Sequence, residues 1–207
     1  MNHLQSLVLA ITLLVGGVSV AIAQDFNKGL KAAQSGDFQT ALQEWRPLAE
    51  QGNAAAQYNL GRMYVNGLGV PQDYVEAARW YRLSAEQGYA QAQSNLGIMI
   101  QEGRGVSQDY AEAVKWYRLA VEQGNVDAYF NLALMYDYGQ GVSQDYAEAV
   151  TWYRLAAEQG HASAQNNLGV KHGLGEGALQ SNVMAHMWYN IASANGDTEA
   201  GELRAFL

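Results

Sequence analysis

Polar residues that could do chemistry return in this chain at a fixed spacing. Asp73, Asp109 and Asp145 stand 36 residues apart, and each is followed three positions later by a Glu. A catalytic site occurs once, whereas a residue that returns in every unit usually serves the fold. We therefore interpret the Asp series as helix N-caps that accept hydrogen bonds from free backbone N–H groups, with the Glu reaching back as a capping box.

Two other recurring patterns also have structural interpretations. The Gly67-x-Gly69 turn and its counterparts lack the third Gly and the Lys of a phosphate-binding loop, and they follow expected helices rather than strands. The tryptophans occupy equivalent positions, which indicates packing between helices rather than a stacking platform for bases. They are Trp80, Trp116, Trp152 and Trp188.

The residues that do not repeat offer little for catalysis. His172 and His186 have no third ligand at a metal-binding spacing, and no Ser-His-Asp arrangement, Gly-x-Ser-x-Gly or His-Glu-x-x-His motif occurs. The chain has 0 Cys, which excludes thiolate catalysis, disulfides and Cys-ligated metals. We expect no enzymatic activity, no cofactor and no metal.

The charge balance narrows the class of partner. The 207 residues carry 12 Lys+Arg against 20 Asp+Glu, a net charge of -8, which repels phosphate backbones and anionic lipid surfaces. Hydrophobic residues make up 49%, enough to bury a core. We expect a monomer that binds neither nucleic acid nor, once its leader is removed, a membrane.

The N-terminus has the pattern of an export signal. An uncharged apolar run from Leu7 is followed by Ala21-Ile22-Ala23, the small-x-small pattern that signal peptidase recognises. We predict a signal peptide over residues 1–23, cleavage between Ala23 and Gln24, and a periplasmic or secreted product. The alternative is an uncleaved anchor, although the apolar run is shorter than the ~20 residues of a spanning helix.

The elements that position these residues form one repeat. Glu-Gln-Gly ends at Gly52, Gly88, Gly124 and Gly160, and Asn195-Gly196 continues the series. Fixed periods of this length indicate stacked supersecondary units. We predict an N-terminal half repeat at 24–52, repeats at 53–88, 89–124 and 125–160, a divergent fourth at 161–196, and a partial C-terminal helix at 197–207.

Each repeat is expected to fold as two helices. Ala56, Leu60 and Tyr64 share one helical face, and the Gly-x-Gly turn ends that helix. The second helix begins after Asp73 and ends at Gly88. No strand pattern occurs, so the predicted fold is all-α, and the helix pairs must stack into a superhelix to bury their apolar faces.

These motifs resemble a known repeat family. Gln57-x-x-Leu60-Gly61-x-x-Tyr64, followed by Gly67-x-Gly69 and by Ala77-x-x-Trp80-Tyr81, looks like the Sel-one-like repeat (SLR), a relative of the tetratricopeptide repeat. The resemblance implies an α-solenoid, a right-handed superhelix of antiparallel helix pairs, that binds other proteins. In the fourth repeat His172 stands where Tyr64 does, as expected of a capping repeat with a polar outer face.

In the tetratricopeptide relatives the first helices line a concave groove, and the matching positions here vary between repeats. Variable residues on a constant frame suit a binding surface, although unconstrained positions would vary as well. In the fourth repeat these positions include Val170 and Leu174. The predicted partner-binding groove contains Tyr58, Asn59, Arg62, Asn66, Ser94, Asn95, Ile98, Gln101, Glu102, Phe130, Asn131, Leu134, Asp137, Tyr138 and Asn167.

Exposed Tyr, Phe and Arg are the expected anchors of this groove, and Gln101→Ala is expected to change stability by no more than about 0.5 kcal/mol. The recurring Asn is either a carboxamide ladder for an extended peptide or a bond to a neighbouring repeat. The predicted function is an exported, non-catalytic scaffold for a protein or peptide partner. The alternatives are a secreted host-interacting factor and, from another class, a cell-wall-fragment binder or hydrolase.

Overall fold

The computed structural model describes residues 26–203, and every regular element in that range is helical, which confirms the all-α prediction. The predicted signal peptide and its cleavage site lie outside the described residues. A helix over 26–34 precedes α2 (Phe38–Glu50), α3 (Ala54–Asn66), α4 (Tyr74–Glu86), α5 (Ala90–Glu102), α6 (Tyr110–Val121), α7 (Val126–Tyr138), α8 (Tyr146–Glu158), α9 (Ala162–Leu174), α10 (Asn182–Ala194) and α11 (Thr198–Leu203).

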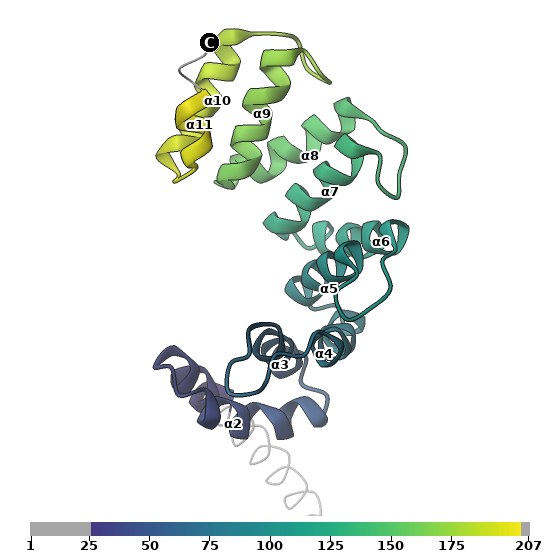
Figure 1. Ribbon diagram of the computed structural model, residues 1–207, viewed down its shortest axis with the longest axis vertical. Helices are drawn as coiled ribbons and strands as arrows, with labels where there is room; N and C mark the ends of the chain where they lie inside the picture. The colour runs from purple at the N-terminus through teal and green to yellow at the C-terminus, as the bar shows by residue number, and fades with distance from the viewer. Residues whose placement is uncertain (1–25, 204–207) are drawn as a thin grey trace, which may run out of the picture. The chain divides into compact units, whose positions relative to one another are not determined.

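The helices fall into two compact units that divide between Gln87 and Gly88. In the first unit α3 packs against both α2 and α4. In the second unit α5, α7 and α9 each pack against the helix that follows, and α6–α7 and α8–α9 contacts join successive pairs (Figure 1). The two helices of a pair run antiparallel, since the Ser84 hydroxyl near the end of α4 donates to the Ala54 carbonyl at the start of α3.

The second helices begin at the predicted caps. Asp73 accepts hydrogen bonds from the backbone N–H groups of Val75 and Glu76, and Asp145 caps α8 in the same way. The predicted reach-back of the later Glu is wrong for Glu76 and Glu148. The Asp73 N–H already donates to the Tyr64 carbonyl at 3.0 Å, and Glu76 instead pairs with Arg79 at 3.0 Å.

The first helices of the repeats begin and end differently from the second helices. Asn53 and Asn125 cap α3 and α7 through their side-chain oxygens, and His161 caps α9 through Nδ1, which accepts from the Ala164 N–H at 3.2 Å. Gly67 ends α3 with φ 65°, a left-handed conformation that a residue with Cβ rarely adopts. The predicted Gly-x-Gly helix stops are therefore confirmed.

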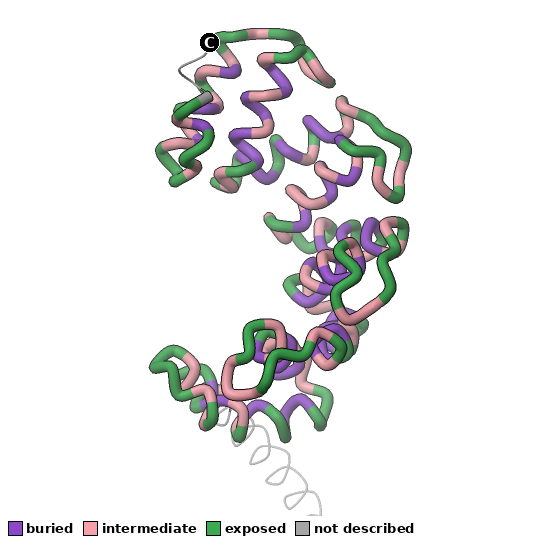
Figure 2. Tube along the Cα trace, viewed as in Figure 1, coloured by how far each residue is buried: buried purple, intermediate pink, exposed green. Residues whose placement is uncertain are grey.

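Packing within a pair depends on close approach of the two helices. A Cβ added at Gly61 would lie 2.5 Å from the Tyr81 ring, so the small residue on α3 makes room for the aromatic residue on α4. Leu60 and Leu96, one position earlier in their repeats, are 0% exposed. Within each unit the buried stretches recur along the helices, while the connecting turns are mostly exposed (Figure 2).

Carboxamide pairs join the end of a second helix to the first helix of the same repeat. The Gln87 amide donates to Gln57 Oε1 at 2.7 Å, and Gln123 donates to Gln93 at 2.8 Å. In the fourth repeat Asn195 makes the same bond to Gln165 at 2.9 Å. These pairs are part-buried and carry no net charge. They therefore hold the two helices of a repeat together without the desolvation cost that a buried ion would have.

Within residues 26–203, no helix combines the length and apolar character needed to cross a membrane.

Candidate functional site: the first-helix faces

The α3 residues of the predicted groove lie on one face of the first unit. Asn59 and Arg62 line a cavity, whereas Tyr58 is half-buried against Tyr81, with ring centroids 5.8 Å apart. The Arg62 guanidinium carbon lies 5.9 Å from the Tyr58 ring, and the exposed Asn66 donates to the Arg62 carbonyl. The structure thus brings three of the four residues together and turns Asn66 back onto its own helix.

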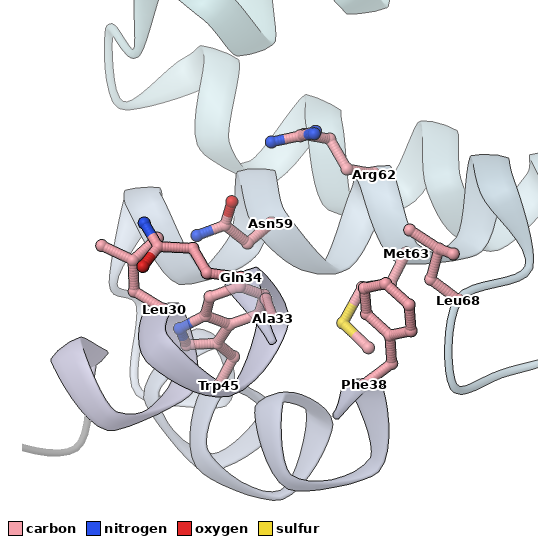
Figure 3. A pocket seen from close by; sticks show the side chains of 9 residues that line it. All are labelled: Leu30, Ala33, Gln34, Phe38, Trp45, Asn59, Arg62, Met63 and Leu68. Carbon is pink, nitrogen blue, oxygen red and sulfur yellow. The ribbon is translucent and has the colours of Figure 1, made fainter. Parts of the chain in front are cut away.

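This first cavity has a volume of about 430 Å³ and lies between helix 26–34, α2, α3 and the turn after α3 (Figure 3). Trp45 and Met63 are buried at 4% and 2% exposure, and Leu30 is 39% exposed. The cavity is apolar inside with a polar rim. It is lined by Leu30, Ala33, Gln34, Phe38, Trp45, Asn59, Arg62, Met63 and Leu68.

The α5 residues of the second unit are largely engaged in intramolecular contacts. Ser94 is 2% exposed, so its side chain does not lie on an open face. Gln101 accepts a hydrogen bond from the Tyr117 hydroxyl at 2.6 Å, and Glu102 pairs with Arg104 at 2.9 Å. Asn95 and Ile98 are half-buried. Because Tyr117 is 0% exposed and takes Gln101 as its acceptor, the structure favours a destabilising Gln101→Ala change over the near-neutral one expected from the sequence.

Phe130 on α7 was expected to be an exposed anchor, and that expectation is wrong. Its ring stacks on His161 of the next repeat at 4.4 Å and contacts Tyr153 at 6.0 Å, which leaves it half-buried. Asn131 and Leu134 are half-buried as well. Tyr138, at 66% exposure, is the open aromatic residue of this helix.

A second cavity, of about 370 Å³, opens between α7, α9 and the turns that follow them. Several of its lining residues occupy predicted groove positions, while others were not foreseen. Asp137, Tyr138, Asn167, Val170 and Leu174 belong to the first group, and Gln144, Tyr146, Lys171 and Glu176 to the second.

A buried ionic cluster borders this second cavity, and sequence reasoning missed it. Lys171 and Asp137 are each 6% exposed, and Lys171 Nζ lies 2.5 Å from Asp137 Oδ1 and 2.8 Å from Glu176 Oε2. The Tyr153 hydroxyl donates to Asp137 Oδ2 at 3.0 Å. The available signal was Lys171 itself, which stands where Met63, Met99 and Met135 stand in the other repeats.

The surroundings of Lys171 favour its protonated form. Burial by itself lowers the pKa of Lys171, but hydrogen bonds to Asp137 and Glu176 outweigh it, so the net shift raises that pKa. The ammonium also lies 4.5 Å from the Tyr146 ring centroid. A lysine held protonated between two carboxylates is neither a nucleophile nor a base at neutral pH, so the cluster suits recognition and structure.

The recurring Asn residues differ in their surroundings. Asn59 lies at the edge of the first cavity, as Figure 3 shows. Asn167 hydrogen-bonds to Tyr153 of the preceding repeat, which supports the structural interpretation for that member of the series. Asn95 and Asn131 are half-buried on the corresponding faces of α5 and α7.

The two histidines considered as a metal pair have separate roles. His172 is 8% exposed, and its Nδ1 lies 3.2 Å from the Leu179 carbonyl. His186 is half-buried on α10. Over residues 26–203, no three His, Cys, Asp or Glu side chains gather in a group that could hold a metal ion.

The helix pairs, their glycine turns and their stacking define an α-solenoid of short helical repeats. The Sel1 repeat profile matches residues 54–89, 90–125, 126–161 and 162–197, one residue later than the predicted boundaries. The chain belongs to the Sel1 repeat family. Sel1 repeat proteins are non-catalytic scaffolds that generally mediate protein–protein interactions.

Solved structures agree with this assignment. A protective antigen of uropathogenic Escherichia coli with an SLR fold is 38% identical with a TM-score of 0.84, covering 94% of this chain. The chain spans only 42% of that antigen's length. A Sel1 repeat protein from Oxalobacter formigenes is 35% identical with a TM-score of 0.81, over 86% of this chain and 73% of its own.

A Sel1 repeat protein from Klebsiella pneumoniae shares the fold at 21% identity and a TM-score of 0.60, over 89% of this chain and 91% of its own. Comparison with curated proteins gave no match.

Proposed function

We propose that this chain is an exported, non-catalytic scaffold that binds a protein or peptide partner on its first-helix faces. Within the first unit the proposed surface is the face of α3, and within the second unit it is the faces of α5, α7 and α9, each unit taken by itself. The observation that carries the proposal is the position of the two cavities. Each is lined by residues at the groove positions of the first helices, Asn59 and Arg62 in one and Tyr138 and Asn167 in the other.

The chemistry of these faces supports recognition of a polypeptide. Arg and Tyr side chains are enriched at binding hot spots, and both Arg62 and Tyr138 are exposed at the edge of a cavity. The carboxamide of Asn59 offers a donor and an acceptor of the kind that pairs with peptide backbone.

Export is a separate part of the proposal. It is supported by the apolar run from Leu7 and the Ala21-x-Ala23 motif. Mass spectrometry of the protein recovered from envelope and medium fractions should show an N-terminus at Gln24. An intact Met1 would contradict signal cleavage and favour an anchor.

A second candidate is a secreted factor that contacts host proteins. The observation that favours it is the 38% identity to a bacterial protein described as a protective antigen. The distribution of the mature chain between periplasm and medium separates the two candidates, because a host-contacting factor must leave the cell.

Site-specific photo-crosslinking tests the binding surface. A photoreactive residue in place of Arg62 or Tyr138 should capture the partner from an envelope fraction. Val75 on α4 and Val183 on α10 are matched controls, since they are 63% and 79% exposed but lie on second helices. Equal capture from the control positions would contradict the assignment of the surface.

A further inference from the structure

We propose that the cavity of the first unit is an anchoring pocket for an extended acidic peptide segment. The segment places a large apolar side chain in the cavity and a carboxylate, two residues away, on Arg62. This inference deepens the proposed function and rests on it, because it names the partner chemistry of one of the two faces.

The interior of the cavity selects an apolar side chain. Phe38, Met63 and Leu68 group on one side, and Leu30 and Trp45 lie on the other (Figure 3). The Trp45 indole N–H already donates to the Phe26 carbonyl at 3.2 Å, so the ring leaves no unmet polar group in the cavity. An apolar side chain that enters the cavity is removed from water, and it also covers the exposed part of Leu30.

The rim selects a negative charge. Arg62 is the single charged residue among the nine that line the cavity, and the others on the rim are the carboxamides Gln34 and Asn59. A guanidinium pairs with a carboxylate through two parallel hydrogen bonds, which adds orientation to charge. The second cavity has the opposite balance, with Asp137 and Glu176 against Lys171, so it offers no comparable preference for an acidic group.

The spacing of the two ligand groups follows from α3. Met63 forms part of the cavity wall, whereas its neighbour Arg62 extends from the rim (Figure 3). In an extended peptide, residues i and i+2 project from the same face, so an apolar residue and an acid two positions apart can meet cavity and rim together. Asn59 lies one helical turn before Met63 and can bond to the peptide backbone between them.

The probe is a fluorescein-labelled, C-terminally amidated peptide, Gly-Ser-Phe-Ser-Glu-Ser-Gly, titrated against the mature chain by fluorescence polarisation. We expect saturable binding. A peptide with Gln in place of the Glu should bind about tenfold more weakly, the effect of losing about 1.4 kcal/mol. A peptide with Ser in place of the Phe should lose saturable binding.

Variants of the protein locate the site. Arg62→Gln should weaken the Glu peptide about tenfold and remove the preference for Glu over Gln, and Leu30→Ser should weaken every Phe-containing peptide. Arg154→Gln is the matched control, because it removes one exposed positive charge from α8, outside the cavity. Equal affinity for the Glu and Gln peptides, or equal effects of Arg62→Gln and Arg154→Gln, would overturn the proposal.

Three further outcomes test the occupant of the cavity and separate this inference from the function on which it rests. If octanoate displaced the peptide with an affinity equal to that of the peptide itself, the cavity would be assigned to a small amphiphile and the peptide proposal would be overturned. Crosslinking of a partner from Tyr138 but not from Arg62 would leave the proposed scaffold function intact and refute this pocket. Failure of both crosslinks would remove both proposals.

Discussion

Replacing Lys171 by Met should destabilise the second unit by about 3–5 kcal/mol, because removal of one partner of a buried ion pair leaves the other charge uncompensated. Two carboxylates are left behind. Asp137, at 6% exposure, has its Oδ1 2.5 Å from the lysine Nζ, and the half-buried Glu176 has its Oε2 2.8 Å away. Met fits the site sterically, since Met135 is 0% exposed at the equivalent position of the preceding repeat. The expected loss of stability would therefore come from the uncompensated charge and not from steric overpacking.

The chain itself supplies the rescue. In the second repeat, the position equivalent to Asp137 is Gln101, which accepts from the Tyr117 hydroxyl much as Asp137 accepts from Tyr153. Combining Lys171→Met with Asp137→Gln should bring stability to within about 1 kcal/mol of the unsubstituted chain or above it, because apolar and neutral replacements avoid the desolvation of both ions.

Urea unfolding followed by circular dichroism gives the free energies of all four members of this double-mutant cycle. Amide hydrogen exchange in α9 shows whether the loss is local to the fourth repeat. A single Lys171→Met change worth less than about 1 kcal/mol, or a double variant as unstable as the single one, would refute a stabilising contact between buried charges.

Three further predictions concern stability. Burial lowers the pKa of His161 more than nearby Asp127 raises it, so the unfolded chain takes up the proton first. Stability should therefore be full above pH 6.5 and fall as the pH drops below it. His161→Asn should remove this acid dependence in urea titrations across pH. Leu96→Ala should lower the free energy of unfolding by about 2–5 kcal/mol, because it leaves a cavity in the core. Gln101→Ala should lower it by about 1–3 kcal/mol, because the buried Tyr117 hydroxyl loses its acceptor. A Gln101→Ala variant that unfolds thermally like the unsubstituted chain would contradict a stabilising hydrogen bond at this position. Burial raises the pKa of Tyr117 and of Tyr153 in the folded chain, so the unfolded chain loses these protons first. The free energy of unfolding should therefore hold below pH 10 and fall above it. In an ultraviolet titration both phenolates should appear only when the chain unfolds.

Local features of this fold were predictable because they depend on residues close in sequence. The caps at Asp73 and Asp145 and the left-handed Gly67 each act within a few positions, and the repeat shows them several times over. The signal for a helix end is thus complete in the local sequence.

The contacts of the candidate site were less predictable because they form between repeats. Asp137 and Lys171 are 34 positions apart and meet only when α9 packs against α8, the partner helix of α7. Phe130 was expected to be open, yet it is half-buried because the next repeat places His161 on its ring. A helical face assigned from one repeat contains no information about the neighbour that covers it.

The Asp137–Lys171 contact also bears on how such an array evolves. A carboxamide pair such as Gln123–Gln93 closes within one repeat, so duplication or deletion of whole repeats carries it along intact. The Asp137–Lys171 contact joins the third repeat to the fourth. Loss of the third alone would place Gln101 where Asp137 stands and leave Glu176 of the same repeat as the remaining carboxylate beside Lys171. Deleting the third repeat would therefore break a buried ionic contact, whereas the carboxamide pairs of the other repeats would stay intact.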